Sequence, residues 1–202
     1  MITRPKFSVI AVDYDQHVPR DGMRAGLQSL ADQTFKDFEL VIVHDGPKST
    51  PYEDEVDFKA LGLSPVILNT PERMNNWGHS GRDLGMRHAT GDYFVQFNID
   101  NRFFPGAFKF ISDGIDETTT GEEIFIFTIR HFKHTGGRPF YGVPPVHCAI
   151  DAMQLVAHRD IWEDMDYWYK TEPTSDGMIY EEMCHRFPYK HLGYDSILGD
   201  NY

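Results

Sequence analysis

Short apolar runs recur along the chain, and each run ends at polar or turn-forming residues. Runs of this length between turn signals predict buried strands over residues 7–12, 38–43, 65–69, 94–97 and 123–129. The segments between them place apolar residues at helical spacing. They predict helices over residues 23–30, 80–89, 105–115 and 175–187, and a polar, partly helical segment over residues 51–63.

Strands that alternate with helices predict the α/β class, with a mainly parallel central sheet and helices on both faces. The second half differs, because residues 131–146 are rich in Gly, Pro and aromatic side chains. This composition predicts a long loop or hairpin, and such segments commonly carry binding function. The chain shows no internal repeat and no flexible linker, so we expect a single domain over residues 1–202.

The chain has 202 residues, two of them cysteines, and a formal net charge of -12. A nucleic-acid ligand requires a basic surface, so we expect no nucleic-acid partner. Two cysteines do not form a disulfide framework, which predicts a reducing compartment. The sequence has no signal-peptide core and no apolar run long enough for a transmembrane segment. It therefore predicts a soluble cytoplasmic protein and leaves peripheral contact with a membrane open.

Several common binding motifs are missing. The turn after the first predicted strand, residues 11–22, has no G-x-G-x-x-G dinucleotide fingerprint, and the chain has no P-loop. Residues 78–82 read Gly-His-Ser-Gly-Arg and lack the last glycine of a nucleophile elbow. The spacing of His131 and His134 fits no zinc site, nor does the adjacent pair of Cys184 and His185.

Three predicted strands end at an acidic residue, namely Asp13, Asp45 and Asp100. The carboxyl ends of parallel strands meet at one edge of a sheet, where α/β proteins bind ligands. Crowded carboxylates are costly unless a cation or a hydrogen-bonding ligand lies among them, and a hard cation such as Mg²⁺ or Mn²⁺ would in turn hold phosphate. Arg73 and Arg82 can pair with the same phosphate, or alternatively form surface salt bridges. An alternative for Asp100 is an Asx turn that closes the strand.

The ordered set of these features resembles the family-2 glycosyltransferases, which have the GT-A nucleotide-diphospho-sugar transferase fold. The matching segments, in the order and at the spacing of that family, are residues 7–14, 29–46, 81–93 and 97–101. The resemblance covers residues 7–110 well and residues 145–187 loosely. It implies that residues 1–110 form a nucleotide-sugar-binding half and residues 111–202 an acceptor-binding half.

The resemblance implies roles for particular residues. Val12 and Tyr14 correspond to positions that line the base pocket, by backbone contact and by aromatic stacking. Asp45 corresponds to the second acid of an Asp-Asp pair, and it would accept a hydrogen bond from the uracil ring or an equivalent base edge; the first acid of the pair is replaced by a histidine. Arg73 and Arg82 are candidates for contacts to the base or the diphosphate.

Residues 98–100, Asn-Ile-Asp, correspond to the Asp-x-Asp motif of the family. The resemblance implies that Asp100 binds the divalent metal, Mn²⁺ or Mg²⁺, that bridges the diphosphate. Asn98 replaces the first acid, so it can hydrogen-bond a ribose hydroxyl but brings no charge. A late histidine, His191, is a further candidate contact to metal or phosphate.

Inverting sugar transfer needs a base that takes the proton of the acceptor hydroxyl. Asp176, ahead of the last predicted helix, resembles the acidic motif of the family there, and we expect it to be this base. Its alternative role is an N-cap, and Glu172 and then Asp151 are the next choices for the base. Four aromatic residues suit either a platform for a sugar acceptor or core packing. They are Trp162, Tyr167, Trp168 and Tyr169.

These features together predict an inverting glycosyltransferase. It would move a hexose from a nucleoside-diphosphate sugar, with UDP as the expected nucleotide, to a saccharide or glycolipid acceptor with the help of a divalent metal. One alternative is a sugar nucleotidyltransferase, but residues 11–20 lack the Gly-rich basic loop that such enzymes usually need. The other is a catalytically silent nucleotide-sugar-binding module, which the amide at Asn98 and the compact length keep open.

Overall fold

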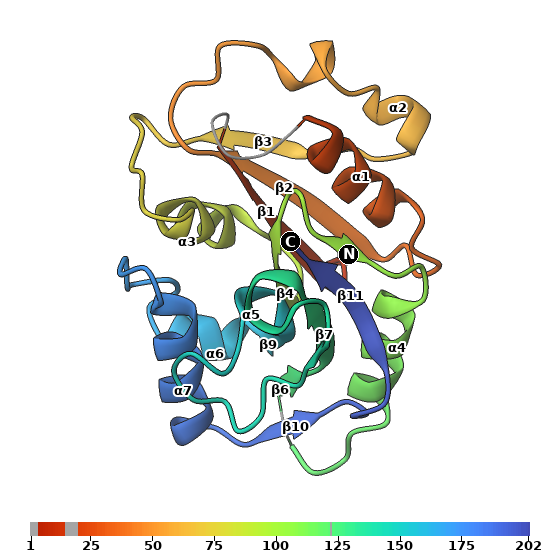
Figure 1. Ribbon diagram of the computed structural model, residues 1–202, viewed down its shortest axis with the longest axis vertical. Coiled ribbons are helices and arrows are strands. Elements are labelled where there is room, and N and C mark those ends of the chain that lie inside the picture. The colour runs from red at the N-terminus through yellow and green to blue at the C-terminus, as the bar shows by residue number, and fades with distance from the viewer. Residues whose placement is uncertain (1–3, 15–19, 122) are drawn as a thin grey trace.

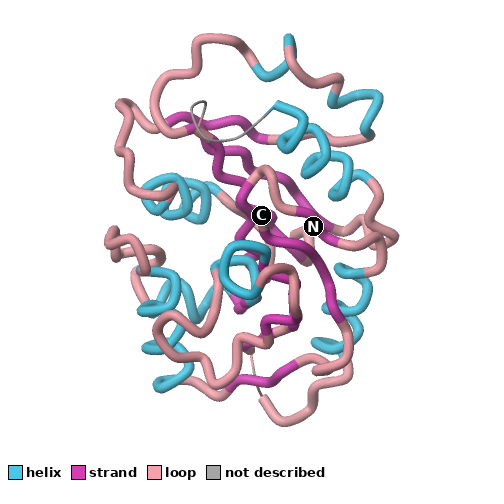
Figure 2. Tube along the Cα trace, viewed as in Figure 1, coloured by secondary structure: helices cyan, strands magenta, loops and turns pink. Residues whose placement is uncertain are grey.

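The computed structural model describes residues 4–14, 20–121 and 123–202. Residues 15–19, part of the segment without a Gly-rich basic loop, therefore lie outside the described residues. A seven-stranded sheet runs through the molecule between two layers of helices (Figures 1 and 2). In spatial order its strands are β10 (Tyr189–His191), β6 (Ile124–Ile126), β9 (Leu155–His158), β4 (Tyr93–Asn98), β1 (Phe7–Asp13), β2 (Phe38–His44) and β3 (Val66–Asn69).

The direction of the strands is mainly parallel, as predicted. β9 pairs antiparallel with β4 and β6, whereas the other neighbours in this sheet pair parallel. β1 lies between β2 and β4, and its residue Val12 is in register with Val43 on one side and Asn98 on the other. The carboxyl ends of the three strands therefore meet at one edge of the sheet, where the residues that follow them form the candidate site.

Two helical layers bury the two faces of the sheet. Alternate side chains of β1 show the division, because Val9 and Ala11 belong to one hydrophobic cluster and Ile10 to the other. The first cluster includes helices α1 (Arg20–Ala31) and α4 (Ala107–Asp116). The second includes helices α3 (His79–His88), α6 (Arg159–Asp164) and α7 (Ser175–Arg186), on the opposite side in Figure 1. The predicted fold class is thus confirmed.

A smaller sheet and several short helices complete the fold. The smaller sheet contains, in spatial order, β5 (Arg102–Phe103), β11 (Ile197–Asn201), β7 (Thr128–His131) and β8 (Pro139–Phe140). The short helices are η1 (Tyr52–Asp54), α2 (Phe58–Leu61), α5 (Phe132–Thr135) and η2 (Ala152–Gln154). β7 and β8 pair antiparallel on either side of α5, so the aromatic segment over residues 131–146 begins as a hairpin.

The prediction of a single strand over residues 123–129 is wrong. The segment forms two strands, β6 in the large sheet and β7 in the small one. Phe127 lies between them. Its backbone N–H donates to the Gln154 carbonyl at 3.1 Å, and the Gln154 side-chain amide donates to the Phe127 carbonyl at 3.1 Å. A buried glutamine thus satisfies the backbone where the chain passes from one sheet to the other.

Gly26 brings helix α1 against the segment that carries Asp100. A Cβ atom at Gly26 would lie 1.9 Å from the Ile99 carbonyl oxygen, a distance that no side chain tolerates. Alanine gains helix propensity of about 1 kcal/mol over glycine, but here it must displace either the helix or residues 99–101. Close packing of α1 on this segment therefore requires glycine.

We expect Gly26→Ala to lower the free energy of unfolding by roughly 1–3 kcal/mol, the usual cost of overpacking a buried site. Urea denaturation followed by circular dichroism would measure it. Gly106→Ala is the matched control, since no atom lies within 4 Å of a Cβ atom placed there. Equal stability of the two variants would show that the helix is not held this tightly.

Candidate active site

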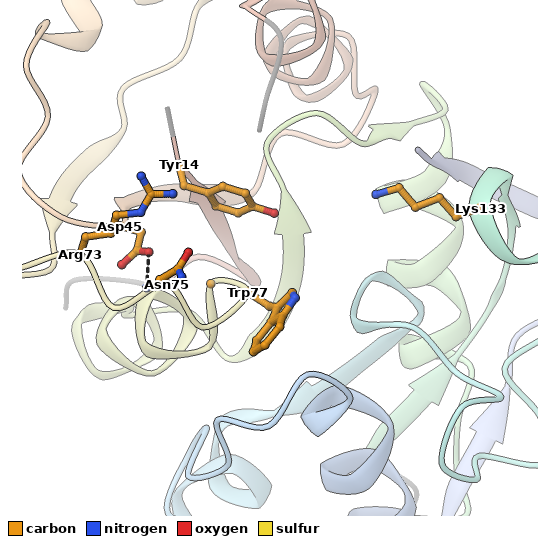
Figure 3. Close-up of a pocket in the computed structure, with 7 residues that line it drawn as sticks. Tyr14, Asp45, Arg73, Asn75, Trp77 and Lys133 are labelled. Atoms are coloured by element: carbon orange, nitrogen blue, oxygen red, sulfur yellow. Dashed lines mark hydrogen bonds between the residues drawn. The ribbon is translucent and has the colours of Figure 1, made fainter. Parts of the chain in front are cut away.

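Two adjoining pockets open at the carboxyl ends of β1, β2 and β4. Their volumes are about 440 Å³ and about 250 Å³. Tyr14, Trp77 and Lys133 line both, so the two pockets form one continuous crevice. The first pocket extends toward Asp45 (Figure 3), and the second extends toward Asp176.

Asp45 organises the wall of the first pocket. Its carboxylate accepts hydrogen bonds from the backbone N–H groups of Met74 at 2.7 Å and Asn75 at 2.8 Å. Gly46, with a φ of 90°, allows the backbone of Arg73 to pass within 3.1 Å of the position of a Cβ atom. A carboxylate has about four acceptor positions, so Asp45 keeps capacity for a ligand in addition to this loop. The predicted contact with a base edge stays a prediction.

Aromatic rings face the junction of the pockets. Tyr14 follows β1 and is half-buried, and burial raises the pKa of its hydroxyl. Trp77 is 56% exposed and has a φ of 57°. A positive φ is rare for a bulky residue, and the residues that adopt it cluster near functional sites. Val12 is buried and packs closely against Gly78, which follows Trp77. A Cβ atom placed on Gly78 would lie 2.9 Å from Cγ2 of Val12. Val12 therefore supports the site from below.

Arg82, on α3, is a buried link between the loop and the sheet. Its Nη1 donates to the Trp77 carbonyl at 3.0 Å, and its Nη2 donates to Oδ1 of Asn98 at 2.5 Å. The guanidinium also lies over the Trp168 ring at 5.2 Å. Burial lowers the pKa of Arg82, and the negative charge of Asp176 opposes this effect. Arg82 thus places a positive charge beside the second pocket while it holds the residue that replaces the first acid of the motif.

None of the four aromatic residues offered as an acceptor platform lines either pocket, and core packing, the alternative, is confirmed for two of them. Trp162 and Trp168 are buried in the second hydrophobic cluster. Tyr167 packs on a surface arginine, and the exposed Tyr169 hydroxyl bonds a glutamate of α7. The two tryptophan rings lie in the core because burial of their large apolar surface is favourable.

His79 stacks on Trp168, with ring centroids 5.6 Å apart, and its Nδ1 accepts a hydrogen bond from the indole N–H at 3.1 Å. Burial, together with the positive charge of Arg82, lowers the pKa of His79 to about 3. The imidazole is therefore neutral at physiological pH. It serves to hold Trp168 rather than to exchange protons.

Asp176 lies in the first turn of α7 and lines the second pocket. The backbone N–H of Ala152 donates to its carboxylate at 3.2 Å. Burial raises the pKa of Asp176, and the negative charge of Asp151 adds to this effect, against the hydrogen bonds and the charge of Arg82. A raised pKa gives a carboxylate a stronger tendency to take a proton, which suits a general base.

The other two candidate bases have different environments. Asp151 caps η2 and bonds Met153 N–H at 2.9 Å, the Asn201 amide at 2.7 Å and His131 Nε2 at 3.4 Å. Burial alone would raise the pKa of Asp151, but the hydrogen bonds from His131 and Met153 outweigh it and lower the pKa. Glu172 is exposed and lines neither pocket.

The three acids at the strand ends differ in what satisfies them. Asp13 is buried and accepts a hydrogen bond from the Tyr52 hydroxyl at 2.6 Å, and Asp45 binds backbone N–H groups. Hydrogen bonds within the protein therefore already satisfy part of two of the three carboxylates at this edge. Asp100 differs from the others, because burial and then the charge of Asp13 raise the pKa of its carboxyl, and no described side chain donates a hydrogen bond to it.

Asp100 is the residue that best fits a divalent metal. It lies within electrostatic reach of Tyr14 and Lys133, which line both pockets, although it does not itself line either. Within residues 4–14, 20–121 and 123–202, no three His, Cys, Asp or Glu side chains form a metal-binding group. Mg²⁺ and Mn²⁺ are commonly held by one or two carboxylates plus the phosphates of a substrate, so Asp100 fits such an ion only together with a bound diphosphate.

His191 does not take part in the crevice. It lies on the edge strand β10, stacks on Tyr194 with ring centroids 4.0 Å apart, and lines neither pocket. The predicted contact with metal or phosphate is wrong, because β10 is at the far end of the sheet from β1 and β2.

Several of the residues that line the second pocket were not identified as site residues from the sequence. They are Trp77, Lys133, His131, His134, Phe140 and Tyr202. The composition of residues 131–146 did indicate a binding segment, but it did not indicate which side chains face the crevice. Trp77 had one signal, a large aromatic residue inside a polar, glycine-containing stretch.

The fold and the crevice define a protein of the GT-A class. The structure superposes on S. aureus TarS with a TM-score of 0.76 and 17% sequence identity, over 97% of this chain and 36% of TarS. It superposes on TarS 1-349 in complex with UDP with a TM-score of 0.77 and 16% identity, over 96% of this chain and 60% of that one. For the mannosyltransferase PcManGT from Pyrobaculum calidifontis, in complex with GDP-Man and Mn²⁺, the TM-score is 0.70 at 12% identity, over 99% of this chain and 57% of that one.

Residues 8–138 match glycosyl transferase family 2, and the chain belongs to this family. The resemblance inferred from the ordered motifs is therefore confirmed. A curated relative, the uncharacterized glycosyltransferase YwdF of Bacillus subtilis (strain 168), is 26% identical over 203 residues, which cover 98% of this chain. The chain spans 64% of the length of YwdF and 36% of that of TarS.

Among the helices of the described residues, none combines the length and the apolar character that a membrane crossing requires.

Folding raises the pKa of Asp176, so the folded protein is more stable when this carboxyl group is protonated than when it is ionised. This contribution is fully present below the unfolded-state pKa and is lost as the pH rises through the raised pKa. We expect Asp176→Asn to raise the Tm at about pH 7 and to change it little at about pH 3.5. Thermal melts across this range, with exposed Asp195→Asn as control, would measure the effect, and a lower Tm at neutral pH would contradict it.

Proposed function

We propose that the protein is an inverting glycosyltransferase that moves a hexose from a nucleoside-diphosphate sugar to a saccharide or lipid-linked acceptor. Membership of glycosyl transferase family 2 supports the reaction class. UDP is the nucleotide we favour, since solved structures of the similar TarS contain UDP and UDP-GlcNAc. The donor would occupy the first pocket and the acceptor the second.

One observation carries this proposal. Asp176, a carboxyl group with a raised pKa, lies in the second pocket, which joins the pocket of Asp45 at Tyr14, Trp77 and Lys133. A nucleotide in the first pocket would direct its sugar across this junction toward Asp176. This is the position that a base needs in order to activate an acceptor on the opposite side of the sugar from the diphosphate.

The chain's own residues would act in a single displacement. Asp176 would take the proton of the acceptor hydroxyl while the hydroxyl oxygen forms a bond to the anomeric carbon. The bond from that carbon to the diphosphate oxygen would break, and the oxygen would leave with the electron pair. Because the acceptor attacks from the side opposite the leaving group, the configuration inverts. Arg82 would keep Asn98 and the Trp77 loop in place during the reaction.

Asp100 would hold Mn²⁺ or Mg²⁺ together with the diphosphate. When bound, such an ion supplies positive charge that stabilises the leaving group. Support comes from PcManGT, a structural neighbour that was solved in complex with GDP-Man and Mn²⁺. Asn98 supplies no second carboxylate, since it is an amide that already accepts a hydrogen bond from Arg82.

A catalytically silent nucleotide-sugar-binding module is the second candidate. The single carboxylate of Asp100 at the motif favours it, because weak metal binding would slow transfer more than it would weaken binding. The two candidates differ in turnover and not in nucleotide binding, so measurement of both properties on the same protein separates them.

The first test is a thermal-shift panel of UDP, GDP, dTDP and CDP, each with and without Mn²⁺. We expect one nucleotide to stabilise the protein more with Mn²⁺, by about 2.7 kcal/mol when the ligand is at about 100 times its Kd. Asp100→Asn should keep the metal-independent shift and lose the increment due to Mn²⁺, whereas Asp195→Asn should keep both. No shift with any nucleotide would overturn the proposed donor site.

The second test concerns the base. Asp176→Asn should lower kcat for release of the nucleoside diphosphate from its donor sugar by about 10²–10⁴-fold, the usual contribution of a general base. The nucleotide shift should be unchanged, because Asp176 lines only the second pocket. Glu172→Gln is the matched control and should retain activity. A wild-type protein that binds nucleotide but never turns over would favour the silent module.

A further inference from the structure

Lys133 is placed where the two pockets meet. It lies in α5, between β7 and β8, and it lines both pockets. In Figure 3 its side chain extends from α5 toward Tyr14, across the crevice from Asp45 and Arg73. The side chain is exposed, and no described residue forms a hydrogen bond or ion pair with its ammonium group. Its positive charge is therefore directed into the crevice and is available to a ligand.

The backbone around Lys133 is well anchored. The side chain of His131 caps α5 by accepting a hydrogen bond from His134 N–H at 3.3 Å, and His131 is itself bound to Asp151. The adjacent Phe132 ring stacks on Tyr202, with centroids 4.9 Å apart and planes 7° from parallel. A fixed backbone with a free side chain suits a residue that must meet a charged ligand at a defined place.

The electrostatic setting of Lys133 is unusual for this chain. The net charge is -12, yet residues 124–150 contain no Asp or Glu. The nearby Arg130 is neutralised by Asp200 through contacts of 2.6 and 2.7 Å, whereas Lys133 has no such partner among the described residues. The charge of Lys133 reaches Asp100, whose pKa it lowers against the effect of burial. Lys133 therefore lies within electrostatic reach of Asp100, and the two carry opposite charges.

We propose that Lys133 binds the diphosphate of the donor and stabilises the charge that develops on it during sugar transfer. The inference rests on the proposed function, in which the diphosphate lies at the junction of the pockets. The ammonium group would donate hydrogen bonds to the phosphate oxygens as the bond to the anomeric carbon breaks, with no proton transferred. Asn98 is uncharged, so Asp100 is the one carboxylate of the motif that can hold a metal ion. The ammonium group of Lys133 would add positive charge beside the diphosphate and so make up for part of this loss.

The experiment measures the affinity of wild type, Lys133→Met and Lys133→Arg for uridine, UMP and UDP, in EDTA and in Mn²⁺, by isothermal titration calorimetry. If GDP, dTDP or CDP is the nucleotide that stabilises the wild type, the series of that nucleoside replaces the uridine series. Loss of a charge-assisted hydrogen bond should weaken binding of UDP to Lys133→Met in EDTA by roughly 10- to 100-fold. The effect should be smaller for UMP and absent for uridine. Mn²⁺ should reduce the loss, and Lys133→Arg should restore most of the affinity.

Arg138→Met is the matched control. Arg138 is an exposed cation of the same acid-free segment that lines neither pocket, so its removal should leave all affinities unchanged. An equal loss for uridine, UMP and UDP in Lys133→Met would assign the residue to the shape of the pocket and overturn the inference, as would an unchanged affinity for UDP. A wild-type protein that binds no nucleotide of the thermal-shift panel would instead overturn the proposed function.

Discussion

The buried guanidinium of Arg82 is the interaction on which the crevice depends. It joins the carbonyl of Trp77, in the loop before α3, to the side chain of Asn98 at the end of β4. Its flat face lies over Trp168, which also hydrogen-bonds His79. Burial of an arginine is costly unless its charge and its N–H groups are satisfied. Here the two Nη groups are bonded and Asp176 lies nearby, while the buried Nε has no hydrogen-bond partner among the described residues. One residue thus fixes both the loop and the electrostatics of the second pocket.

Carboxylates of the same chemical type do different work because their surroundings differ. Asp45 and Asp151 accept several hydrogen bonds and hold backbone segments in place. Asp176 and Asp100 are partly buried with few donors, so burial raises the pKa of each. Insertion of the antiparallel strand β9 between β4 and β6 creates this difference in the second pocket. It brings η2, which precedes it, against α7, so that Ala152 can bond Asp176.

Most of the large sheet could be predicted, since its strands are short apolar runs with turn residues at both ends. The helices over residues 80–89 and 175–187 were also close to their observed bounds. The break at Phe127 could not be predicted, because it depends on the amide of Gln154, which is distant in the sequence. The candidate site was predictable at the strand ends and at Asp176, where motif spacing carries information. Lys133 was not, because its role comes from the packing of a hairpin against the sheet edge.

The sequence by itself determined the α/β class, the order of the central elements and the family, because hydrophobic periodicity and motif spacing are local properties of the chain. Only the tertiary structure decided which side chains face the crevice. In the folded chain Trp162 and Trp168 are buried in the core, and His191 lies outside the crevice. Trp77 and Lys133 line the crevice. These outcomes follow from contacts between residues far apart in the sequence, and each contact competes with the gain from burying apolar surface. The pKa values of the acids follow from the same contacts, because desolvation and neighbouring charges exist only in the folded chain.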